Sequence, residues 1–377
     1  MKTIRDIEYL EGVKVLVRAD FNVPIKNGEV VDDFRIRAAM PTIEFLSKKG
    51  AKVILVSHLE NLEGENGSLE PVSKHLAQLG CSASFIKNWN SAPQILDLQV
   101  KNGQCVLLEN VRFFEGEKKN DPKFAKEIAS LADIYVNEAF PASHREHASI
   151  VGVPKLLPSY AGLQFENEVV HISKAFKPAH PFVFVLGGAK FDTKLPLIER
   201  FLGLADTIFM GGALANDVLK AKGFNIGDSK VSNGEKDISK VVSAENVIIP
   251  IDVIIQDKVI KDVKMIDGHD RILDAGPKTL EILAEKINQA KFILWNGPLG
   301  PYEDGYVEGT EAVAKMIAAA TKNGAESIIG GGDTLASIKN LGIEDKFTFV
   351  SSGGGAMLDF LAKGTLPGIE ALKNSKI

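Results

Sequence analysis

The residues best suited to chemistry begin in the stretch 327–334, where an apolar run passes into glycines 330–332, then Asp333 and Thr334. Glycine lets a backbone pass close to a ligand, and consecutive amide N–H groups can bind phosphate oxygens. A carboxylate such as Asp333 is a suitable ligand for Mg²⁺, which commonly binds together with nucleotide phosphates. On its own, this pattern fits a tight turn as well as a phosphate site.

Apolar runs that end in small residues recur in the same half of the chain, at residues 182–190, 207–213, 292–300 and 347–356. Open parallel sheets bind ligands outside the carboxyl ends of their strands. Several such ends at one edge favour a phosphate site lined by backbone amides over a set of unrelated turns. A helix expected over 356–362 would begin directly after glycines 353–355 and direct its positive end toward that site.

Lys190 and Lys194 follow the first of these strand ends and are four residues apart. They share one face if a helix begins there. One lysine can then follow a moving phosphoryl group while the other holds a nucleotide phosphate, because phosphoryl transfer depends mainly on positioning and charge stabilisation. Without the glycines before them, two solvated helix lysines would be the better interpretation.

The expected strand ends of the first half carry polar side chains instead of glycines. They include Asp20, Asn22, Ser57, His58, Glu109, Asn110, Arg112, Asn137 and Glu138, with Arg35 and Arg145 on nearby segments. Arginine offers a planar fork for phosphate or carboxylate. A single arginine is more often solvated or paired at the surface. Arg35, Arg112 and Arg145 together, with His58 beside them, favour a small, polyanionic, hydroxylated ligand.

Strands that alternate with helices must position these residues. In the first half, strands are expected at 13–18, 53–56, 105–108 and 133–136, and helices at 34–49, 71–79 and 122–131. This alternation predicts an α/β fold with a doubly wound parallel sheet, and the pattern repeats from residue 182. With 377 residues, 45% hydrophobic and 25% charged, the chain is long enough for two such domains.

The predicted boundaries divide the chain into consecutive parts. They are 1–160, an N-terminal domain for the polyanion; 161–180, an interdomain helix and hinge; 181–355, a C-terminal nucleotide-binding domain; and 356–377, a C-terminal helix and tail that returns to the N-terminal domain. A polar segment over 257–270 has weak strand character and is expected to be an excursion from the second domain.

Composition and motifs exclude several classes of protein. The formal net charge of −5 argues against a general nucleic-acid surface. Cys81 and Cys105 lack metal-ligand spacing and fit core thiols of a reducing compartment, and the lack of a long apolar run or secretory leader predicts a cytoplasmic protein. The chain has no G-x-x-x-x-G-K-[ST] motif, which excludes a P-loop kinase, and no G-x-G-x-x-G motif, which weakens a dinucleotide-binding interpretation.

Short motifs in a fixed order extend along nearly the whole chain. They are residues 18–24 (Arg-Ala-Asp-Phe-Asn-Val-Pro), 57–59 (Ser-His-Leu), 108–113 (Leu-Glu-Asn-Val-Arg-Phe), 187–190 (Gly-Gly-Ala-Lys), 295–298 (Trp-Asn-Gly-Pro), 330–334 (Gly-Gly-Gly-Asp-Thr) and 352–356 (Ser-Gly-Gly-Gly-Ala). On these motifs the chain closely resembles the phosphoglycerate kinase family. The resemblance implies a monomer with two Rossmann-like domains and a hinge that closes. It also implies reversible transfer of a phosphoryl group from 1,3-bisphosphoglycerate to MgADP in glycolysis, giving 3-phosphoglycerate and ATP.

The resemblance further implies a role for each matching residue. The phosphoglycerate site would comprise Asp20, Phe21, Asn22, Arg35, His58, Asn61, Arg112 and Arg145, with Arg112 and Arg145 at the remote phosphate. The nucleotide site would comprise Lys194, Asn296, Glu303, Gly331, Gly332, Asp333 and Thr334, with Glu303 at the ribose and Asp333 at Mg²⁺. The catalytic groups would be Arg35, Lys190, Gly332 and Gly355, the glycines acting through nearby amides.

This chain departs from the family pattern in one loop of the substrate site. Glu60 and Asn61 stand where the family usually has Gly-Arg, and that arginine helps bind the substrate phosphate. The loss of one charge-assisted contact weakens binding by roughly 1.5–3 kcal/mol, and Glu60 would repel a phosphate if it faced one. The other departures are Glu138, Pro141, Thr193 and residues 213–216. None removes Arg35, Lys190 or Asp333, so activity is expected to persist.

Two alternatives stay open at this point. A binding paralogue without catalytic activity is consistent with Glu60 and Asn61 as signs of a decayed substrate site. A nicotinamide-dependent oxidoreductase is disfavoured by the missing glycine motif. In a kinase with a carboxylate acceptor, the acceptor is ionised at neutral pH and needs no general base, so His58 is better interpreted as a hydrogen-bonding ligand.

Overall fold

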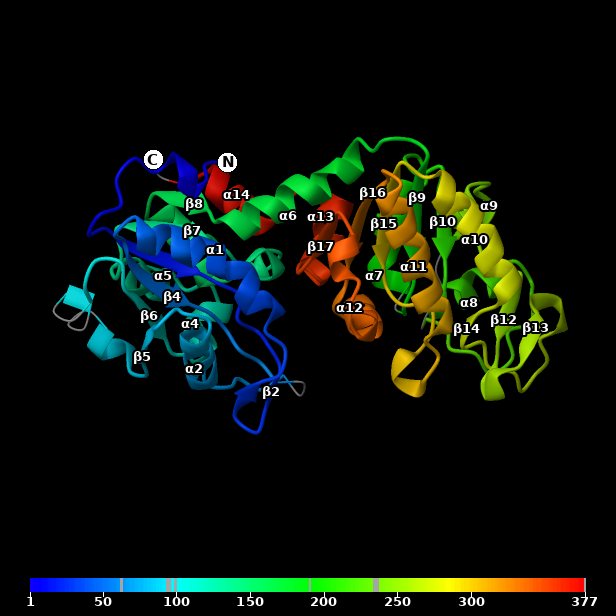
Figure 1. Cartoon of the computed structure of the whole chain (residues 1–377), viewed down its shortest axis with the longest axis horizontal. Helices are drawn as coiled ribbons and strands as arrows, with labels where there is room; N and C mark the ends of the chain where they lie inside the picture. The colour runs from blue at the N-terminus through cyan, green and yellow to red at the C-terminus, as the bar shows by residue number, and fades with distance from the viewer. Residues whose placement is uncertain (62–63, 93–95, 98–99, 190, 233–236, 376–377) are drawn as a thin grey trace. The chain divides into compact units, whose positions relative to one another are not determined.

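The computed structural model describes residues 1–61, 64–92, 96–97, 100–189, 191–232 and 237–375. The chain forms two compact units, which we call the N-terminal unit (Met1–Val170 with Thr365–Ile377) and the C-terminal unit (His171–Gly364). Each unit is built on a six-stranded sheet with helices along it (Figure 1). The prediction of an α/β fold with two doubly wound parallel sheets is therefore confirmed.

In the sheet of the N-terminal unit, all neighbouring strands run parallel. In spatial order the strands are β5 (Ser84–Ile86), β6 (Cys105–Leu108), β4 (Lys52–Val56), β1 (Lys14–Arg18), β7 (Ile134–Asn137) and β8 (Ser159–Ala161). The sequence predicted the central strands well because strands buried on both faces read as continuous apolar runs. It missed β5 and β8, which are edge strands of three residues each and too short to show a hydrophobic period.

In the N-terminal unit, α1 (Phe34–Lys48), α2 (Glu70–Gln78) and α5 (Pro122–Ala129) begin and end close to the expected residues. The short helices α4 (Glu115–Lys118) and α14 (Pro367–Lys373) were not predicted, and α6 (Leu163–Ser173) contains the boundary between the units. A short hairpin of β2 (Ile25–Lys26) and β3 (Glu29–Val30) precedes α1. α1 buries Ile36, Met40 and Ile43, whose spacing places them on one face. The Asp121 carboxylate caps α5 by accepting backbone N–H groups of its first turn.

Both ends of the chain lie in the N-terminal unit. Thr3 forms a parallel bridge with Ala161 at the end of β8. In α14, Gly368 donates its backbone N–H to the carbonyl of Ser143 at 2.9 Å. A Cβ at Gly368 would lie 2.6 Å from the Ser143 side chain, so glycine permits this close approach. The last helix therefore belongs to the N-terminal unit, in the part of the chain that follows Gly364.

The C-terminal unit repeats the same plan with a second, all-parallel sheet. In spatial order its strands are β11 (Val247–Ile248), β10 (Thr207–Met210), β9 (Phe182–Leu186), β15 (Phe292–Asn296), β16 (Glu326–Gly330) and β17 (Phe349–Ser351). Its helices are α7 (Phe191–Phe201), α8 (Gly212–Ala221), α9 (Ser239–Ser243), α10 (Pro277–Gln289), α11 (Glu308–Lys322), α12 (Gly332–Ile338) and α13 (Gly355–Lys363). The two-residue strand β11 was not predicted, again because it is too short for a pattern.

A small antiparallel sheet projects from the C-terminal unit (Figure 1). It consists of β13 (Ile260–Asp262), β12 (Asp252–Ile254) and β14 (Asp274–Ala275). The polar segment 257–270 lies within it, as the sequence predicted. The antiparallel pairing explains the weak strand character, because one face of such a sheet can remain polar.

The two sheets bury separate hydrophobic cores. Val15 and Val17 of β1 belong to the core of the N-terminal unit, and Ile293 and Trp295 of β15 belong to that of the C-terminal unit. Alternate residues of a strand point to the same face of the sheet. Burial of these pairs therefore determines which face each side chain at the end of the strand points to. Across the described ranges, no helix combines the length and apolar character needed to cross a bilayer.

Candidate active site

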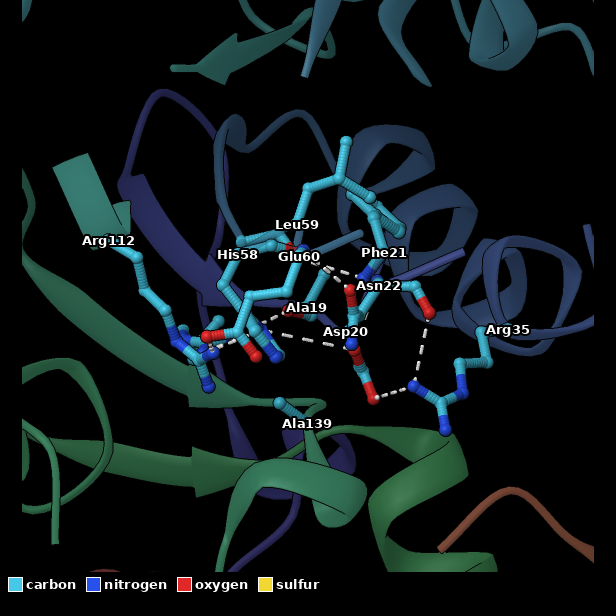
Figure 2. A network of polar contacts seen from close by, with 12 residues as sticks. Ala19, Asp20, Phe21, Asn22, Arg35, His58, Leu59, Glu60, Arg112 and Ala139 are labelled. Carbon is cyan, nitrogen blue, oxygen red and sulfur yellow. Dashed lines mark hydrogen bonds and ion pairs between the residues drawn. The ribbon is translucent and has the colours of Figure 1, made fainter. Parts of the chain in front are cut away.

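In the N-terminal unit, the loops after β1 and β4 hold each other at the carboxyl edge of the sheet (Figure 2). The backbone N–H of Phe21 donates to Ser57 Oγ at 2.8 Å, and the backbone N–H of Glu60 donates to Asn22 Oδ1 at 2.8 Å. The Phe21 side chain is fully buried in the core, so only its backbone faces the loops. These cross-links bring the predicted residues Asp20, Asn22 and His58 together.

Arg35 reaches this edge from the first turn of α1. Its Nη1 donates to Asp20 Oδ2 at 3.2 Å and to the carbonyl of Asn22 at 3.1 Å (Figure 2). The side chain is 31% exposed, so it stays partly accessible while Asp20 fixes the direction of the guanidinium. A guanidinium held in this way is prepared for a planar anionic group.

His58 is positioned by Arg18, the last residue of β1. The Arg18 side chain is fully buried, donates from Nε to Ser149 Oγ at 2.7 Å, and lies with Nη2 3.3 Å from His58 Nδ1. A guanidinium only donates hydrogen bonds, so His58 Nδ1 is the acceptor and Nε2 carries the proton. Burial, followed by the positive charge of Arg18 and of other arginines, holds the pKa of His58 well below its usual range. His58 is therefore a neutral donor at neutral pH.

The sequence did not single out Arg18 as a site residue, although it lies in one of the quoted motifs. Its charge is balanced inside the unit, because Ser149 Oγ also donates to Glu117 Oε1 at 2.6 Å and Glu117 is fully buried. A charged residue at the end of an otherwise apolar strand was the available signal. Burial of such a residue requires partners, and those partners come from segments distant in sequence.

Arg112 follows β6 in a short 3₁₀ turn, where Asn110 Oδ1 accepts its backbone N–H at 3.0 Å. Its guanidinium is completely buried, and its Nε and Nη2 donate no hydrogen bond to another described residue. The charge is paired with the carboxylate of Glu60 (Figure 2). A buried guanidinium with unused donors is suited to binding an anion.

Arg145 and Asn61 are placed differently from the residues above. Arg145 is exposed, and its Nε donates to His144 Nε2 at 3.3 Å. It lies close enough to contribute to the lowered pKa of His58. Asn61 instead directs its side chain into its own loop, where its Nδ2 donates to Glu65 Oε2 at 3.0 Å and its Oδ1 accepts the Glu65 N–H at 2.7 Å. Its role as a substrate ligand stays a prediction.

In the C-terminal unit, the ends of β9 and β15 meet backbone against backbone. The N–H of Gly187 donates to the carbonyl of Asn296 at 2.9 Å, and that of Gly188 to the carbonyl of Pro298 at 2.7 Å. A Cβ at Gly187 would lie 2.2 Å from the Pro298 oxygen, and Gly297 has a φ of 96°. Only glycine permits this approach, which explains physically why these strand ends are glycine-rich.

Thr334 and Asn296 share the neighbouring edge between β15 and β16. Thr334 Oγ1 accepts the Gly297 N–H at 2.7 Å and donates to the Gly330 carbonyl at 3.0 Å. The hydroxyl is therefore engaged within the protein. Asn296 Nδ2, in contrast, is buried and has no hydrogen-bond partner among the described residues. A Cβ at Gly331 would lie 3.1 Å from this nitrogen, so the unused donor faces the glycine-rich turn.

Lys194, on α7, is the described cation nearest these glycines. It is 7% exposed and donates to the carbonyl of Gly187. Burial lowers the pKa of Lys194 to about 8, and the nearby Asp333 opposes that shift only in part. Asp333 is exposed at the start of α12. Lys190, which was predicted to share a helix face with Lys194, lies outside the described residues.

The remaining predicted residues of this unit border open space. A Cβ added to Gly332 or Gly355 would meet no atom within 4 Å, so both turns leave room for a ligand. Glu303 is exposed, and the hydroxyl of Tyr302 donates to its Oε1 at 3.3 Å. Among described residues, no group of three His, Cys, Asp or Glu side chains could hold a metal by itself. Asp333 alone fits Mg²⁺ that is bound mainly through nucleotide phosphates.

A cationic edge on one parallel sheet and a glycine-rich edge on another fit a phosphotransferase that acts on a small anion and a nucleotide. Comparisons with known proteins agree. The family model described as phosphoglycerate kinase matches residues 4–364. The chain belongs to the phosphoglycerate kinase family. It transfers a phosphoryl group reversibly between 1,3-bisphosphoglycerate and ADP in glycolysis, so the activity predicted from the sequence is confirmed.

Similar proteins cover the chain from end to end. Phosphoglycerate kinase of Thermosipho africanus is 44% identical over 397 aligned positions, covering 99% of this chain and 98% of that protein. The corresponding protein of Dictyoglomus turgidum is 42% identical and covers 99% of each chain. Among solved structures, phosphoglycerate kinase from Coxiella burnetii has a TM-score of 0.86 at 36% identity, covering 99% of both chains. The enzyme from Pyrococcus horikoshii also has a TM-score of 0.86, at 30% identity, covering 99% of this chain and 98% of that one.

Proposed function

We propose that the N-terminal unit binds 3-phosphoglycerate and 1,3-bisphosphoglycerate and that the C-terminal unit binds ADP and ATP. The observation that carries this assignment is the buried guanidinium of Arg112: Nη1 is paired with Glu60, whereas Nε and Nη2 have no hydrogen-bond acceptor in the described part of the chain. A phosphate group supplies several such acceptors. The proposed phosphoglycerate residues are Asp20, Phe21, Asn22, Arg35, His58, Asn61, Arg112 and Arg145.

Within the phosphoglycerate site, Arg112 and Arg145 bind the phosphate that is not transferred. Arg35 lies at the other end, beside the carboxyl group that exchanges the phosphoryl group. Its contact with Asp20 supports this role, because the guanidinium is oriented before substrate arrives. His58 donates from Nε2 to a substrate oxygen, since Nδ1 already faces the Arg18 guanidinium.

The proposed nucleotide residues are Lys194, Asn296, Glu303, Gly331, Gly332, Asp333 and Thr334. Lys194 binds a nucleotide phosphate, and the unused Asn296 Nδ2 donates to the nucleotide. Thr334 contributes by holding the ends of β15 and β16 together. Asp333 would hold Mg²⁺, which neutralises charge on the nucleotide phosphates.

During transfer, the phosphoryl group is stabilised by Arg35, by Lys190, and by backbone amides near Gly332 and Gly355. The space above both glycines supports this role. No side chain has to remove a proton, because the acceptor carboxylate is ionised at neutral pH. Positioning and charge stabilisation therefore account for the catalysis expected of this chain.

The enzyme acts as a monomer in the cytoplasm. The family resemblance supports the monomer, and light scattering coupled to size-exclusion chromatography would measure it. Cys81 and Cys105 are buried free thiols, which suits a reducing compartment. A tagged chain found only in a membrane or secreted fraction would contradict the cytoplasmic assignment.

The site assignment is tested with Arg35→Gln in a coupled assay that titrates 3-phosphoglycerate with MgATP. Turnover is expected to fall about 10²-fold, because a charge aimed at the developing transition state is lost. Arg37→Gln is the matched control: Arg37 lies on the same helix, pairs with Asp33 at 2.8 Å and is 63% exposed. Equal kinetics for the two variants would contradict the role of Arg35.

A further inference from the structure

Glu60 places a carboxylate where the substrate phosphate is expected. One oxygen of its side chain pairs with Arg112 Nη1, and the same oxygen lies 3.4 Å from Lys118 Nζ. Figure 2 shows the Glu60 side chain turned toward Arg112. The Glu60 side chain is only 20% exposed, so the contact is partly shielded from solvent. Arg112 thus already has an anionic partner within its own chain.

The backbone around Glu60 holds this carboxylate in position. The Glu60 N–H donates to Asn22 Oδ1 at 2.8 Å, and Glu60 forms an antiparallel bridge with Asn66. Asn66 in turn donates from Nδ2 to the carbonyl of Arg112 at 2.9 Å. The loop therefore connects both partners of the ion pair, and these backbone contacts hold Glu60 beside Arg112.

The carboxylate is ionised at neutral pH. Burial raises the pKa of Glu60, but the hydrogen bond and charge of Arg112, together with Lys118, outweigh that effect and lower it overall. A phosphate entering at Arg112 would meet this negative charge at close range. Two anions at one site repel each other unless one of them leaves or is protonated.

We propose that Glu60 is an internal competitor of the substrate phosphate: its carboxylate occupies Arg112 in the free enzyme, must leave when 3-phosphoglycerate binds, and thereby sets substrate affinity. This inference rests on the proposed function, which assigns Arg112 to the substrate phosphate. It makes Glu60 a residue that tunes affinity for one substrate only. Binding of ADP, in the C-terminal unit, is unaffected.

The test compares wild type with Glu60→Gln by isothermal titration calorimetry, with 3-phosphoglycerate and ADP as separate ligands. Gln preserves the size of the side chain and removes its charge. The affinity for 3-phosphoglycerate is expected to rise about tenfold, the scale of one charge-assisted contact. The affinity for ADP stays the same. Glu115→Gln is the matched control, because Glu115 is an exposed residue at the start of α4 that pairs with Lys119 and forms no ion pair with Arg112 in the described part of the chain.

A second variant separates competition from a structural role. In an Arg112→Gln background the guanidinium for which Glu60 competes is gone, so Glu60→Gln should bring little gain in affinity. If Glu60→Gln does not fold, Glu60→Asp is tested in its place. The aspartate side chain keeps the charge but is shorter, so a smaller rise in the affinity for 3-phosphoglycerate is expected. Unchanged or weaker binding of 3-phosphoglycerate by a folded Glu60 variant would overturn the proposal.

The outcomes also distinguish this inference from the function on which it rests. If Arg112→Gln weakens 3-phosphoglycerate binding while Glu60→Gln does not strengthen it, the competitor role fails and the site assignment stands. If Arg112→Gln leaves 3-phosphoglycerate binding unchanged, the assignment of Arg112 itself fails.

Discussion

The two proposed anion sites of this enzyme differ in the groups that form them. In the N-terminal unit, side chains provide the charge, and a buried polar network holds them. In the C-terminal unit, the proposed site lies at glycine-rich strand ends, which close backbone contacts hold in place. A site made of side chains can change with one substitution, as Glu60 beside Arg112 illustrates. A site made of backbone changes only when a glycine that permits its geometry is lost.

The difference follows from what each site must recognise. A small acid with a remote phosphate presents separated charges, which side chains of different length can reach. Nucleotide phosphates lie against the protein surface, where consecutive N–H groups and an open helix start provide many donors in little space. The carboxyl edge of a parallel sheet can thus carry either kind of anion site, and the residues of the loops determine which kind forms.

The largest expected effect concerns Lys190, because its role was proposed as a cationic side chain that acts beside the backbone amides near Gly332 and Gly355. Replacing Lys190 by Ala should lower turnover by about 10²-fold or more, because its charge is proposed to stabilise the phosphoryl group in transit. Steady-state kinetics with both substrates saturating would measure this. Lys240→Ala provides the control, because Lys240 is 74% exposed and pairs with Glu199. Full turnover in the Lys190 variant would remove it from the mechanism.

The next effect concerns the backbone contacts of the C-terminal unit. Gly187→Ala should lower the free energy of unfolding by about 1–3 kcal/mol, because its Cβ would lie 2.2 Å from the Pro298 oxygen. Chemical denaturation would report the loss. Gly203→Ala is the control, since a Cβ there meets nothing within 4 Å. If both variants were equally stable, the close contact would not be what requires glycine at position 187.

A smaller effect tests the polar network of the N-terminal unit. Ser149→Ala removes the hydroxyl that links Arg18 to Glu117, and should lower stability by about 1–2 kcal/mol. It should also weaken 3-phosphoglycerate binding, because Arg18 orients His58, while ADP binding stays constant. Ser130→Ala, which removes only an exposed hydroxyl bonded to its own helix, is the control. Parallel losses for both ligands would point to general unfolding instead.

The smallest expected effect is a difference between the two sites in how ligand affinity depends on pH. Lys194 has a pKa of about 8, so it is charged below that pH and becomes neutral as pH rises above it. ADP affinity should therefore fall several-fold between about pH 7 and pH 9. Binding of 3-phosphoglycerate should change little, because arginine stays charged and His58 is already neutral. Calorimetry of both ligands across this range tests the prediction, and a parallel decline of both would contradict it.

Much of the architecture could be predicted from local pattern. Buried strands such as β6 and β9 appear as uninterrupted apolar runs, and parallel pairing brings their carboxyl ends to one edge. The same rule applies to β1 and β4, so the sequence predicted that Asp20 and His58, which follow them, lie close together. Edge strands such as β5 escaped prediction, because three residues carry no period.

By itself, the sequence determined which residues stand at the two edges and which chemistry they can supply, because a βα repeat makes the strands parallel and brings their carboxyl ends to one edge of the sheet. Only the tertiary structure decided how those side chains are used. It pairs Glu60 with Arg112, turns Asn61 toward Glu65, and buries Arg18 against His58. These pairings depend on contacts between segments far apart in the chain. Burial of an unpaired charge costs free energy, so buried charged side chains are paired in the folded protein.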